Sequence, residues 1–178
     1  MSNVDALTLD IQNVLAALSP EQLREMLAKT LATKSPEAPV GISAYSLREM
    51  IAAGNFAEVH KAVTAERFPA APSRFTAEGS KVFRVRRRLT TSKLEELMGE
   101  EGYRPGTHET LLAHAKENPD DQRLGPIIAL GSPFQVPDGG PLLVMRLYAE
   151  DGRRKLGLEI DDPTVPWDYG YGFIGVRK

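Results

Sequence analysis

Cysteine is absent from this chain of 178 residues. Without it the protein has no disulfide, no thiolate nucleophile, no cysteine-ligated zinc and no iron–sulfur cluster. Apolar runs long enough to span a membrane are also missing, and the N-terminus lacks the basic start of an export signal. We therefore expect a soluble, cytoplasmic protein with no membrane partner.

An excess of charge of one sign is lacking as well. The 24 acidic residues nearly balance the 22 basic ones, and the net charge is −2. This balance argues against a general polyanion binder, although a local basic patch could still bind one. The hydrophobic fraction of 42% is sufficient for an ordinary folded core, so we expect one globular domain with an appendage.

Recognisable catalytic motifs are absent too. The sequence contains no Gly-x-Ser-x-Gly, no Walker loop and no His-Glu-x-x-His. Its histidines are His60, His108 and His114, and the last two point to different sides of one predicted helix, so they cannot share a metal ion. We predict a protein without enzymatic activity, cofactor or metal ion, although a hydrolase built on a serine or threonine is left open.

The N-terminal residues indicate a separate appendage. Residues 1–33 have the spacing of two short amphipathic helices, and Ser19-Pro20 starts the second. Helices this short are marginal alone, so their apolar stripes must pack on another surface. Either the pair packs on its own chain, or residues 4–31 form a homo-oligomer or bind a partner. Residues 34–43 contain two prolines and a glycine and indicate a linker.

Residues 44–178 form the predicted main domain. Helices are expected to begin at Ser46 and Ser92, each in the Ser-x-x-Glu spacing of a capping box, and at Thr107. A strand is predicted over Lys81–Leu89, with apolar side chains on one face and arginines on the other.

Beyond Pro119, short apolar segments alternate with turns. Pro126–Gly131 is an apolar run, and Pro137–Gly140 and Glu150–Gly152 are predicted turns. Tyr171–Arg177 is predicted to be the final strand. The order of a strand, two helices and then several antiparallel strands predicts an α+β fold.

Two segments of the chain carry a resemblance to a known fold. Gly102–Ala115, with Tyr-Arg-Pro-Gly-Thr before a predicted helix, and the final segment Tyr171–Lys178 resemble the C-type-lectin-like fold. They are most similar to the branch that contains formylglycine-generating enzymes. Residues 46–178 also resemble an uncharacterised bacterial family of unknown function. The further motifs shared with that family are Phe68-Pro69, Ile127–Ser132 and Trp167-Asp168.

The resemblance implies a C-type-lectin-like domain over residues 44–178, with two helices against a twisted antiparallel sheet. Formylglycine-generating chemistry needs cysteine and is therefore excluded. A calcium-dependent sugar site is not expected, because Gln135–Asp138 and Trp167–Tyr169 depart from the loop motifs of such lectins. Variable proteins of diversity-generating retroelements also use this fold and diversify binding residues before the final strand. By analogy, the resemblance implies a binding scaffold here.

The segment 146–171 is the predicted binding surface for a protein or a small ligand. It contains the only Trp and three of the five Tyr, and such rings supply contact area at low conformational cost. Trp167 itself is expected to be structural, and the alternative is that all these rings pack within the fold. Replacing Tyr169 or Tyr171 by Ala should weaken binding without changing Tm. The candidate binding residues are Arg146, Tyr148, Glu159, Asp161, Asp168, Tyr169 and Tyr171.

Charged segments provide two further interpretations. The basic segment Arg84–Arg88 could follow a phosphate backbone, which makes a nucleic-acid-binding module the alternative function. Residues 94–121 are rich in acids, however, and no pair of aromatic residues accompanies the arginines, so nucleic acid is not the expected partner. The four carboxylates within residues 159–168 could surround a hard cation, but they lack EF-hand spacing and no metal site is predicted.

Overall fold

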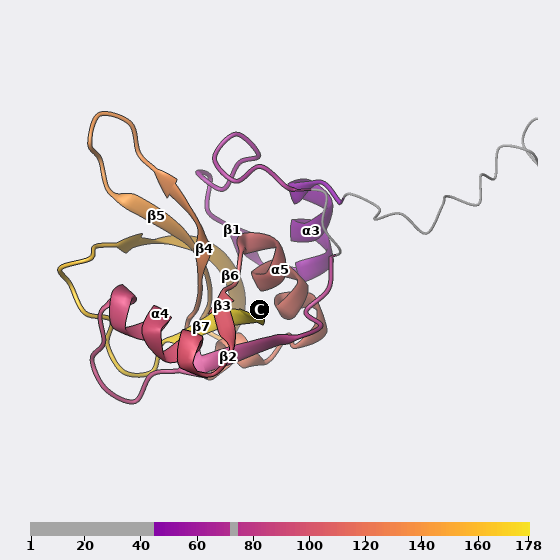
Figure 1. The fold of residues 1–178 in the computed structure, drawn as a ribbon. Coiled ribbons are helices and arrows are strands. Elements are labelled where there is room, and N and C mark those ends of the chain that lie inside the picture. The colour runs from indigo at the N-terminus through magenta and orange to yellow at the C-terminus, as the bar shows by residue number, and fades with distance from the viewer. Residues whose placement is uncertain (1–44, 72–74) are drawn as a thin grey trace, which may run out of the picture. The chain divides into compact units, whose positions relative to one another are not determined.

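The computed structural model describes residues 45–71 and 75–178. The helical pair predicted over residues 1–33 and the linker over 34–43 lie outside the described residues. Within them the fold is α+β, with three α-helices and an open, mixed sheet of seven strands (Figure 1). The helices are α3 (Leu47–Gly54), α4 (Thr91–Glu100) and α5 (His108–Glu117), with a short 3-10 helix, η1 (Asp121–Arg123), after α5.

The sheet is mixed. Its strands are β1 (Glu58–Val59), β2 (Ser80–Arg84), β3 (Tyr103–Pro105), β4 (Ile127–Gln135), β5 (Leu142–Glu150), β6 (Arg153–Asp161) and β7 (Gly172–Arg177). They lie in the order β1-β6-β5-β4-β7-β2, and β3 also pairs with β7. Because β1 runs parallel to β6 and β4 runs parallel to β7, the prediction of an antiparallel sheet is wrong. A period of two locates a strand, but it does not say which distant strand becomes its neighbour.

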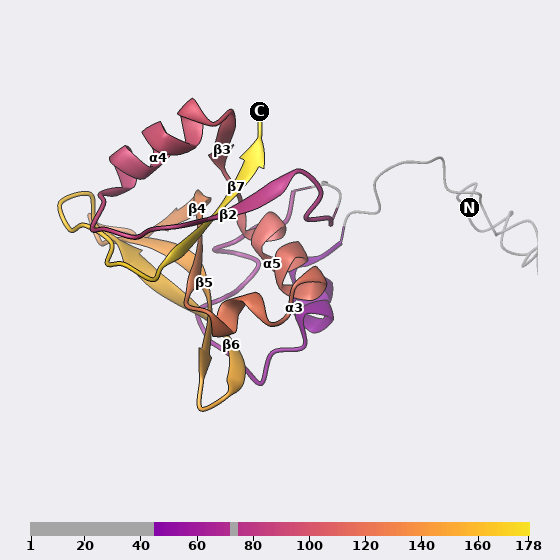
Figure 2. The ribbon, with the colours of Figure 1, turned by 90° about the horizontal axis from the view of Figure 1, so that it is seen from below.

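Two apolar clusters fill the two faces of the sheet. On β5, Met145 belongs to the cluster beneath α3 and α5, whereas its neighbour Val144 belongs to the cluster beneath α4. The sheet therefore lies between α4 and the α3–α5 pair (Figure 2). The three helices predicted near Ser46, Ser92 and Thr107 are present, one more than the two that the resemblance implies. The predicted apolar run is confirmed as buried: Ile127–Leu130 contributes alternately to the two clusters.

Local capping signals were correct for one helix and misplaced for another. The capping box of α3 is confirmed, since Ser46 Oγ accepts the Glu49 N–H and Glu49 Oε2 accepts the Ser46 N–H. α4 does not begin at Ser92. Its N-cap is Thr90, whose side chain accepts the Lys93 N–H at 3.4 Å. Three hydroxyl residues follow one another there, and only the backbone geometry decides which of them is the cap.

The predicted strand over 81–89 is too long. β2 ends at Arg84, and Leu89 instead exchanges backbone hydrogen bonds with Trp167, at 3.2 and 2.8 Å. The two predicted turns are confirmed. Asp138 and Asp151 have φ of 59° and 50°, and each precedes a glycine that also has positive φ.

Candidate binding surface

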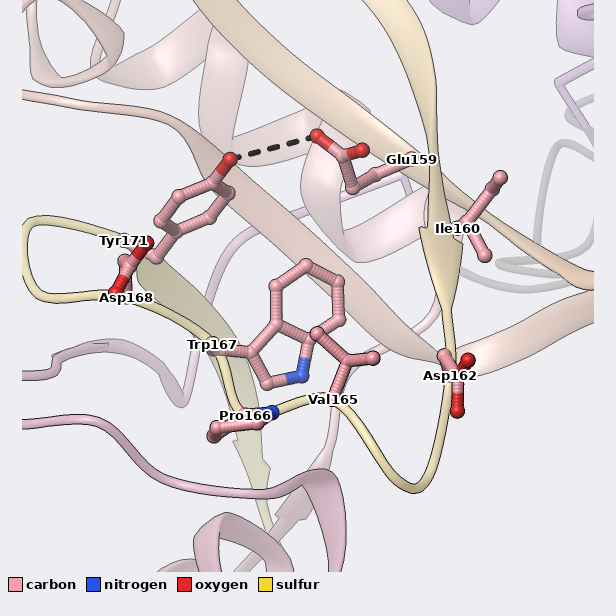
Figure 3. Close-up of a pocket in the computed structure, with 8 residues that line it drawn as sticks. All are labelled: Glu159, Ile160, Asp162, Val165, Pro166, Trp167, Asp168 and Tyr171. Atoms are coloured by element: carbon pink, nitrogen blue, oxygen red, sulfur yellow. Dashed lines mark hydrogen bonds between the residues drawn. The ribbon is translucent and has the colours of Figure 1, made fainter.

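A hollow of about 310 Å³ lies between the end of β6 and the segment 162–171 that leads into β7 (Figure 3). We call it the acidic hollow. Part of its wall comes from β6 and the rest from the loop before β7. The loop residues are therefore held against a rigid strand. It is lined by Glu159, Ile160, Asp162, Val165, Pro166, Trp167, Asp168 and Tyr171.

Trp167 fixes the loop that forms the hollow. Its ring packs edge-on against the Phe173 ring, with the two centroids 5.2 Å apart. The Tyr171 ring is tilted relative to the indole, with centroids 5.5 Å apart. The indole Nε1–H donates to Thr91 Oγ1 at 2.8 Å, which ties the loop to the start of α4. Because the indole is buried and its N–H is hydrogen-bonded, Trp167 holds this wall of the hollow in one position.

Glu159 is the centre of a small polar cluster at the hollow. Arg146, on the neighbouring strand β5, donates from Nη1 to Glu159 Oε2 at 2.5 Å, and the Tyr171 hydroxyl lies 3.5 Å from the same oxygen (Figure 3). The Arg146 guanidinium also stacks over the Tyr148 ring, 4.3 Å from its centroid. Burial raises the pKa of the Tyr171 hydroxyl, and the adjacent Glu159 carboxylate raises it further.

Large apolar side chains are exposed in the lining of the hollow (Ile160 and Val165) and directly after its lining residue Asp168 in the chain (Tyr169), and we call these three the apolar rim. Tyr169 is 75% exposed, Val165 55% and Ile160 54%. Single exposed apolar residues are common on protein surfaces, but two in one concavity with a third next to it in the chain are typical of a contact surface.

The carboxylates of the hollow carry negative charge. Asp162 accepts the Thr164 hydroxyl and N–H at 2.7 and 2.8 Å, and these hydrogen bonds lower the pKa of its carboxyl. Asp168 pairs with Arg88 at 3.0 Å, and both side chains are more than half exposed, so water screens this pair. The eight lining residues include no lysine, arginine, histidine, serine or threonine. The hollow can therefore attract a cation, and its only hydroxyl is the Tyr171 phenol beside Glu159.

Six of the seven predicted binding residues meet at this surface. Glu159, Asp168 and Tyr171 line the hollow, Arg146 and Tyr148 adjoin it, and Tyr169 is exposed between Asp168 and Tyr171 in the chain. Asp161 does not join them.

Asp161 is buried and has a structural contact. Its Oδ1 accepts the Thr91 hydroxyl at 2.5 Å, beneath the start of α4. The sequence interpretation missed Ile160 and Val165, because an apolar residue in a strand or beside a proline normally predicts burial. Only the position of β6 near the edge of the sheet exposes Ile160.

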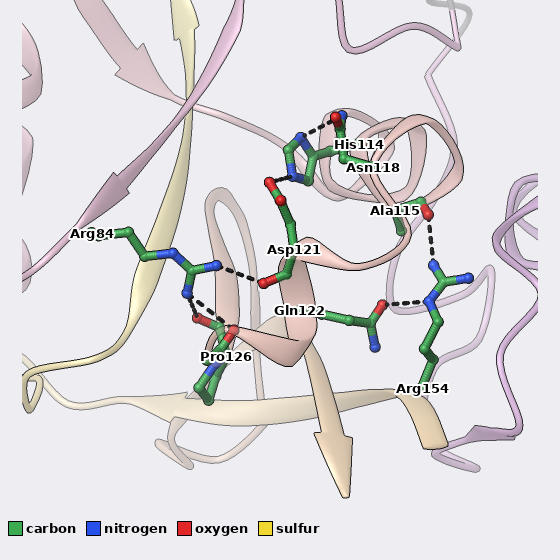
Figure 4. A network of polar contacts seen from close by, with 9 residues as sticks. Arg84, His114, Ala115, Asn118, Asp121, Gln122, Pro126 and Arg154 are labelled. Atoms are coloured by element: carbon green, nitrogen blue, oxygen red, sulfur yellow. Dashed lines mark hydrogen bonds and ion pairs between the residues drawn. The ribbon is translucent and has the colours of Figure 1, made fainter. Parts of the chain in front are cut away.

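The basic segment is not a row of free arginines. Arg84 Nη1 donates to Gly125 O at 3.1 Å and Nη2 donates to Asp121 O at 2.8 Å, so its guanidinium binds backbone carbonyls (Figure 4). Arg86 and Arg87 are exposed, and Arg88 pairs with Asp168. Arg84 therefore does not present its charge together with the other arginines.

The same polar network joins α5 to η1 and the sheet (Figure 4). His114 Nε2 lies 3.0 Å from Asp121 Oδ2, and Arg154 donates to Ala115 O at 2.6 Å and to Gln122 Oε1 at 3.2 Å. Burial lowers the pKa of His114, and the Asp121 carboxylate only partly opposes this effect. These groups hold elements together and do not converge on an open cavity.

A serine and a histidine meet at the start of α5. Ser132 Oγ lies 2.9 Å from His108 Nδ1 and also accepts the His108 backbone N–H at 2.8 Å. The Thr107 side chain makes no capping hydrogen bond, so Ser132 satisfies the helix N-terminus in its place. Burial lowers the pKa of His108, and the Glu109 carboxylate opposes this. We interpret this contact as a helix cap.

Within residues 45–71 and 75–178, no three acidic or histidine side chains lie close enough to hold a metal ion. No helix in this part of the chain is long and apolar enough to cross a membrane. No protein-family model matches the chain, and no curated protein or solved structure matches it.

Proposed function

We propose that this protein is a noncatalytic binding module and that the acidic hollow with its apolar rim is its binding site. The observation that carries the proposal is the combination of Tyr169, Val165 and Ile160 exposed around carboxylates, over a tryptophan that is itself fixed. Exposed aromatic and aliphatic groups supply contact energy, and the carboxylates select a cationic group. The lining has no serine, threonine, histidine or lysine, and this composition supports binding rather than catalysis.

The proposal includes the finer fold assignment, a C-type-lectin-like domain over residues 44–178. Support comes from the order of elements, since Gly102–Ala115 leads into α5 and Tyr171–Lys178 contains the last strand. The hollow is built from the segment that precedes this strand, the same place in the chain where variable proteins of retroelements diversify.

Sequencing the 3′ end of the gene across many cells of its source population tests the variable-protein role. Substitutions concentrated at Ile160, Val165 and Tyr169, with Thr107 and Trp167 unchanged, are the expected result. A uniform sequence over residues 146–171 would contradict diversification and leave a binding site for one fixed ligand.

Binding at the hollow can be tested with the chain's single tryptophan. The probe is a fragment set of small aromatic and aliphatic amines, added to ¹⁵N-labelled full-length protein and followed by NMR. We expect hits to shift the Trp167 indole resonance and the amides of residues 159–171. Tyr169→Ser should weaken these hits severalfold without changing Tm, because the Tyr169 side chain is 75% exposed.

Tyr45→Ser is the matched control. Tyr45 is also an exposed tyrosine, at 41%, but its ring packs at a tilt against Phe75, which packs against the cluster on the opposite face of the sheet. Equal losses for both variants, or hits that shift Arg86–Arg88 and leave Trp167 unchanged, would overturn the proposal. Tyr171 is a poorer test than the sequence suggested, because Tyr171→Ala removes packing against Trp167 and should also lower Tm.

A further inference from the structure

The outer edge of β6 is only partly covered. On its inner side, β6 pairs with β5 along its whole length, from Arg153 to Asp161. On its outer side it pairs with β1, and only at Lys155 and Leu156. Beyond Leu156, no strand of the described residues continues this outer pairing.

The backbone groups that face this open edge can be identified. Arg154 O and Leu156 O accept the N–H groups of Ala57 and His60, so the even-numbered residues of β6 face outward. The register with β5 contains no bulge, and the alternation therefore continues to Leu158 and Ile160. Among the described residues, no backbone group bonds to the outward N–H or C=O of either residue.

Concavities flank the open edge at its end. The acidic hollow is one of them. The second has a volume of about 380 Å³ and shares Ile160 and Asp162 with the first. It is lined by Gln135, Gly140, Pro141, Leu142, Ile160, Asp161, Asp162 and Pro163.

We propose that a short extended segment of a partner protein adds to the edge of β6 at residues 157–161 as a further strand. This inference rests on the proposed function and names the class of ligand for the same site. Strand addition uses main-chain hydrogen bonds for affinity and alternating side-chain contacts for specificity. Exposed edge strands are commonly protected by a lysine or a proline. At the open end of the β6 edge the exposed residue is instead Ile160, whose side chain is 54% exposed.

The charges around the edge define the side chains of the partner. The lining of the two hollows includes Glu159, Asp161, Asp162 and Asp168, and neither hollow is lined by a lysine or arginine. Arg146 and Tyr171 both contact Glu159 through Oε2, and no described residue donates to Oε1. A strand beside β6 places alternate side chains next to Glu159 and next to Ile160. The partner segment therefore alternates basic and apolar residues.

The test uses the full-length protein and a synthetic peptide of about seven residues, capped at both ends, that alternates arginine and valine. We expect binding that shifts the Trp167 indole resonance and the Leu158 and Ile160 amides, and that weakens with added salt. A block peptide of the same composition, with all arginines before all valines, is the control for charge. Equal affinity for the block peptide would overturn strand addition.

Backbone N-methylation provides the sharper comparison. Only every second N–H of an added strand faces β6, so methylation of one alternate set should abolish binding and methylation of the other should leave affinity within about twofold. Equal effects of the two sets, in either direction, would contradict the proposal. This pair needs only the wild-type protein and remains decisive if a variant fails to fold.

A substitution in the edge provides the converse test. Ile160→Pro removes an outward N–H that β5 does not use, and proline is tolerated at such edge positions. Ile160→Pro should weaken binding of the alternating peptide by about tenfold or more. Ile160→Thr keeps the backbone donor and should lose less affinity. Equal losses of affinity in Ile160→Pro and Ile160→Thr would show that the peptide depends only on the Ile160 side chain, and would overturn strand addition.

The outcomes separate this inference from the proposed function. If amine fragments shift Trp167 but the alternating peptide does not bind, strand addition is wrong and the binding module stands. If neither probe shifts residues 157–171, the proposed function fails as well.

Discussion

Thr91 is a single residue that holds three elements together. It opens α4, donates its hydroxyl to Asp161 at the end of β6, and accepts the indole N–H of Trp167 from the loop before β7. Asp161 and Trp167 are buried and Thr91 is half-buried, and no other described side chain bonds to the Asp161 Oδ1 or the Trp167 indole N–H.

We expect Thr91→Val to lower the free energy of unfolding by about 1–3 kcal/mol, because an isosteric side chain leaves a buried donor and a buried acceptor unpaired. Urea denaturation followed by Trp167 fluorescence measures this loss. Ser92→Ala is the matched control, since Ser92 is exposed and its neighbour Thr90 caps the helix. A loss of similar size in both variants would refute the bridging role of Thr91.

The two buried histidines should make the free energy of unfolding depend on pH. Burial lowers the pKa of His108 and His114 below the ordinary value of 6.5, so the unfolded chain binds protons at a higher pH than the folded one. Their contribution is complete above about pH 6.5 and is lost as pH falls through the lowered pKa values. Stability should decrease between pH 7.5 and pH 6 by less than about 1 kcal/mol per histidine.

Urea unfolding at these two pH values provides the measurement. His114→Gln should flatten the dependence even if it lowers stability at both values, because the titrating group is gone. An unchanged slope in this variant would assign the dependence to other groups.

At the scale of elements, a close backbone approach joins β4 to the start of α5. The Gly131 N–H donates to Gly106 O at 2.9 Å, inside the irregular part of β4 between Ala129 and Phe134. A Cβ on Gly131 would lie 2.6 Å from Pro105 O. This contact positions the N-terminus of α5, which Ser132 then caps.

Gly131→Ala should therefore lower stability by about 1–3 kcal/mol, because backbone atoms must move to admit the methyl group. Gly99→Ala is the control within α4, where the nearest atom to a new Cβ is Lys178 Nζ at 3.5 Å. It should be neutral or raise stability by up to about 1 kcal/mol. Thermal denaturation of both variants checks the signs, and a stabilised Gly131→Ala would show that the approach is not tight.

At the scale of the whole described domain, the two apolar clusters share strands β4, β5 and β7. Side chains that alternate along these strands belong to opposite clusters, so neither cluster can be lost while the sheet remains packed. We infer that both unfold in one cooperative step.

Leu112→Ala tests this coupling, because Leu112, on α5, is fully buried against the sheet and Trp167 lies in the cluster on the other face. The Trp167 fluorescence transition in urea should shift by the full cavity cost, about 2–5 kcal/mol. Leu124→Ala, at a residue 78% exposed, should shift it little. A Trp167 transition that does not respond to Leu112→Ala would mean that the clusters unfold independently.

Local signals in the sequence predicted a considerable part of the fold. The capping box at Ser46, the buried run Ile127–Leu130 and the turns at Asp138 and Asp151 all rest on residues within a few positions of one another. Short-range sterics and hydrogen bonds decide such features, so they can be read without knowing the rest of the molecule. The sequence also located the segment that forms the hollow, because its aromatic and acidic residues are clustered along the chain.

Tertiary structure alone decided the roles within that segment. Glu159 and Asp161 share one face of β6, yet only Glu159 lines the hollow, because the start of α4 covers Asp161. Arg84 belongs to the predicted basic face but binds the Asp121 and Gly125 carbonyls, which lie 37 and 41 positions away in the sequence. The parallel pairing of β4 with β7 and the open edge at Ile160 likewise depend on neighbours distant in the chain. Local sequence sets the period of an element, whereas contacts between distant segments determine which face is covered and which is left exposed.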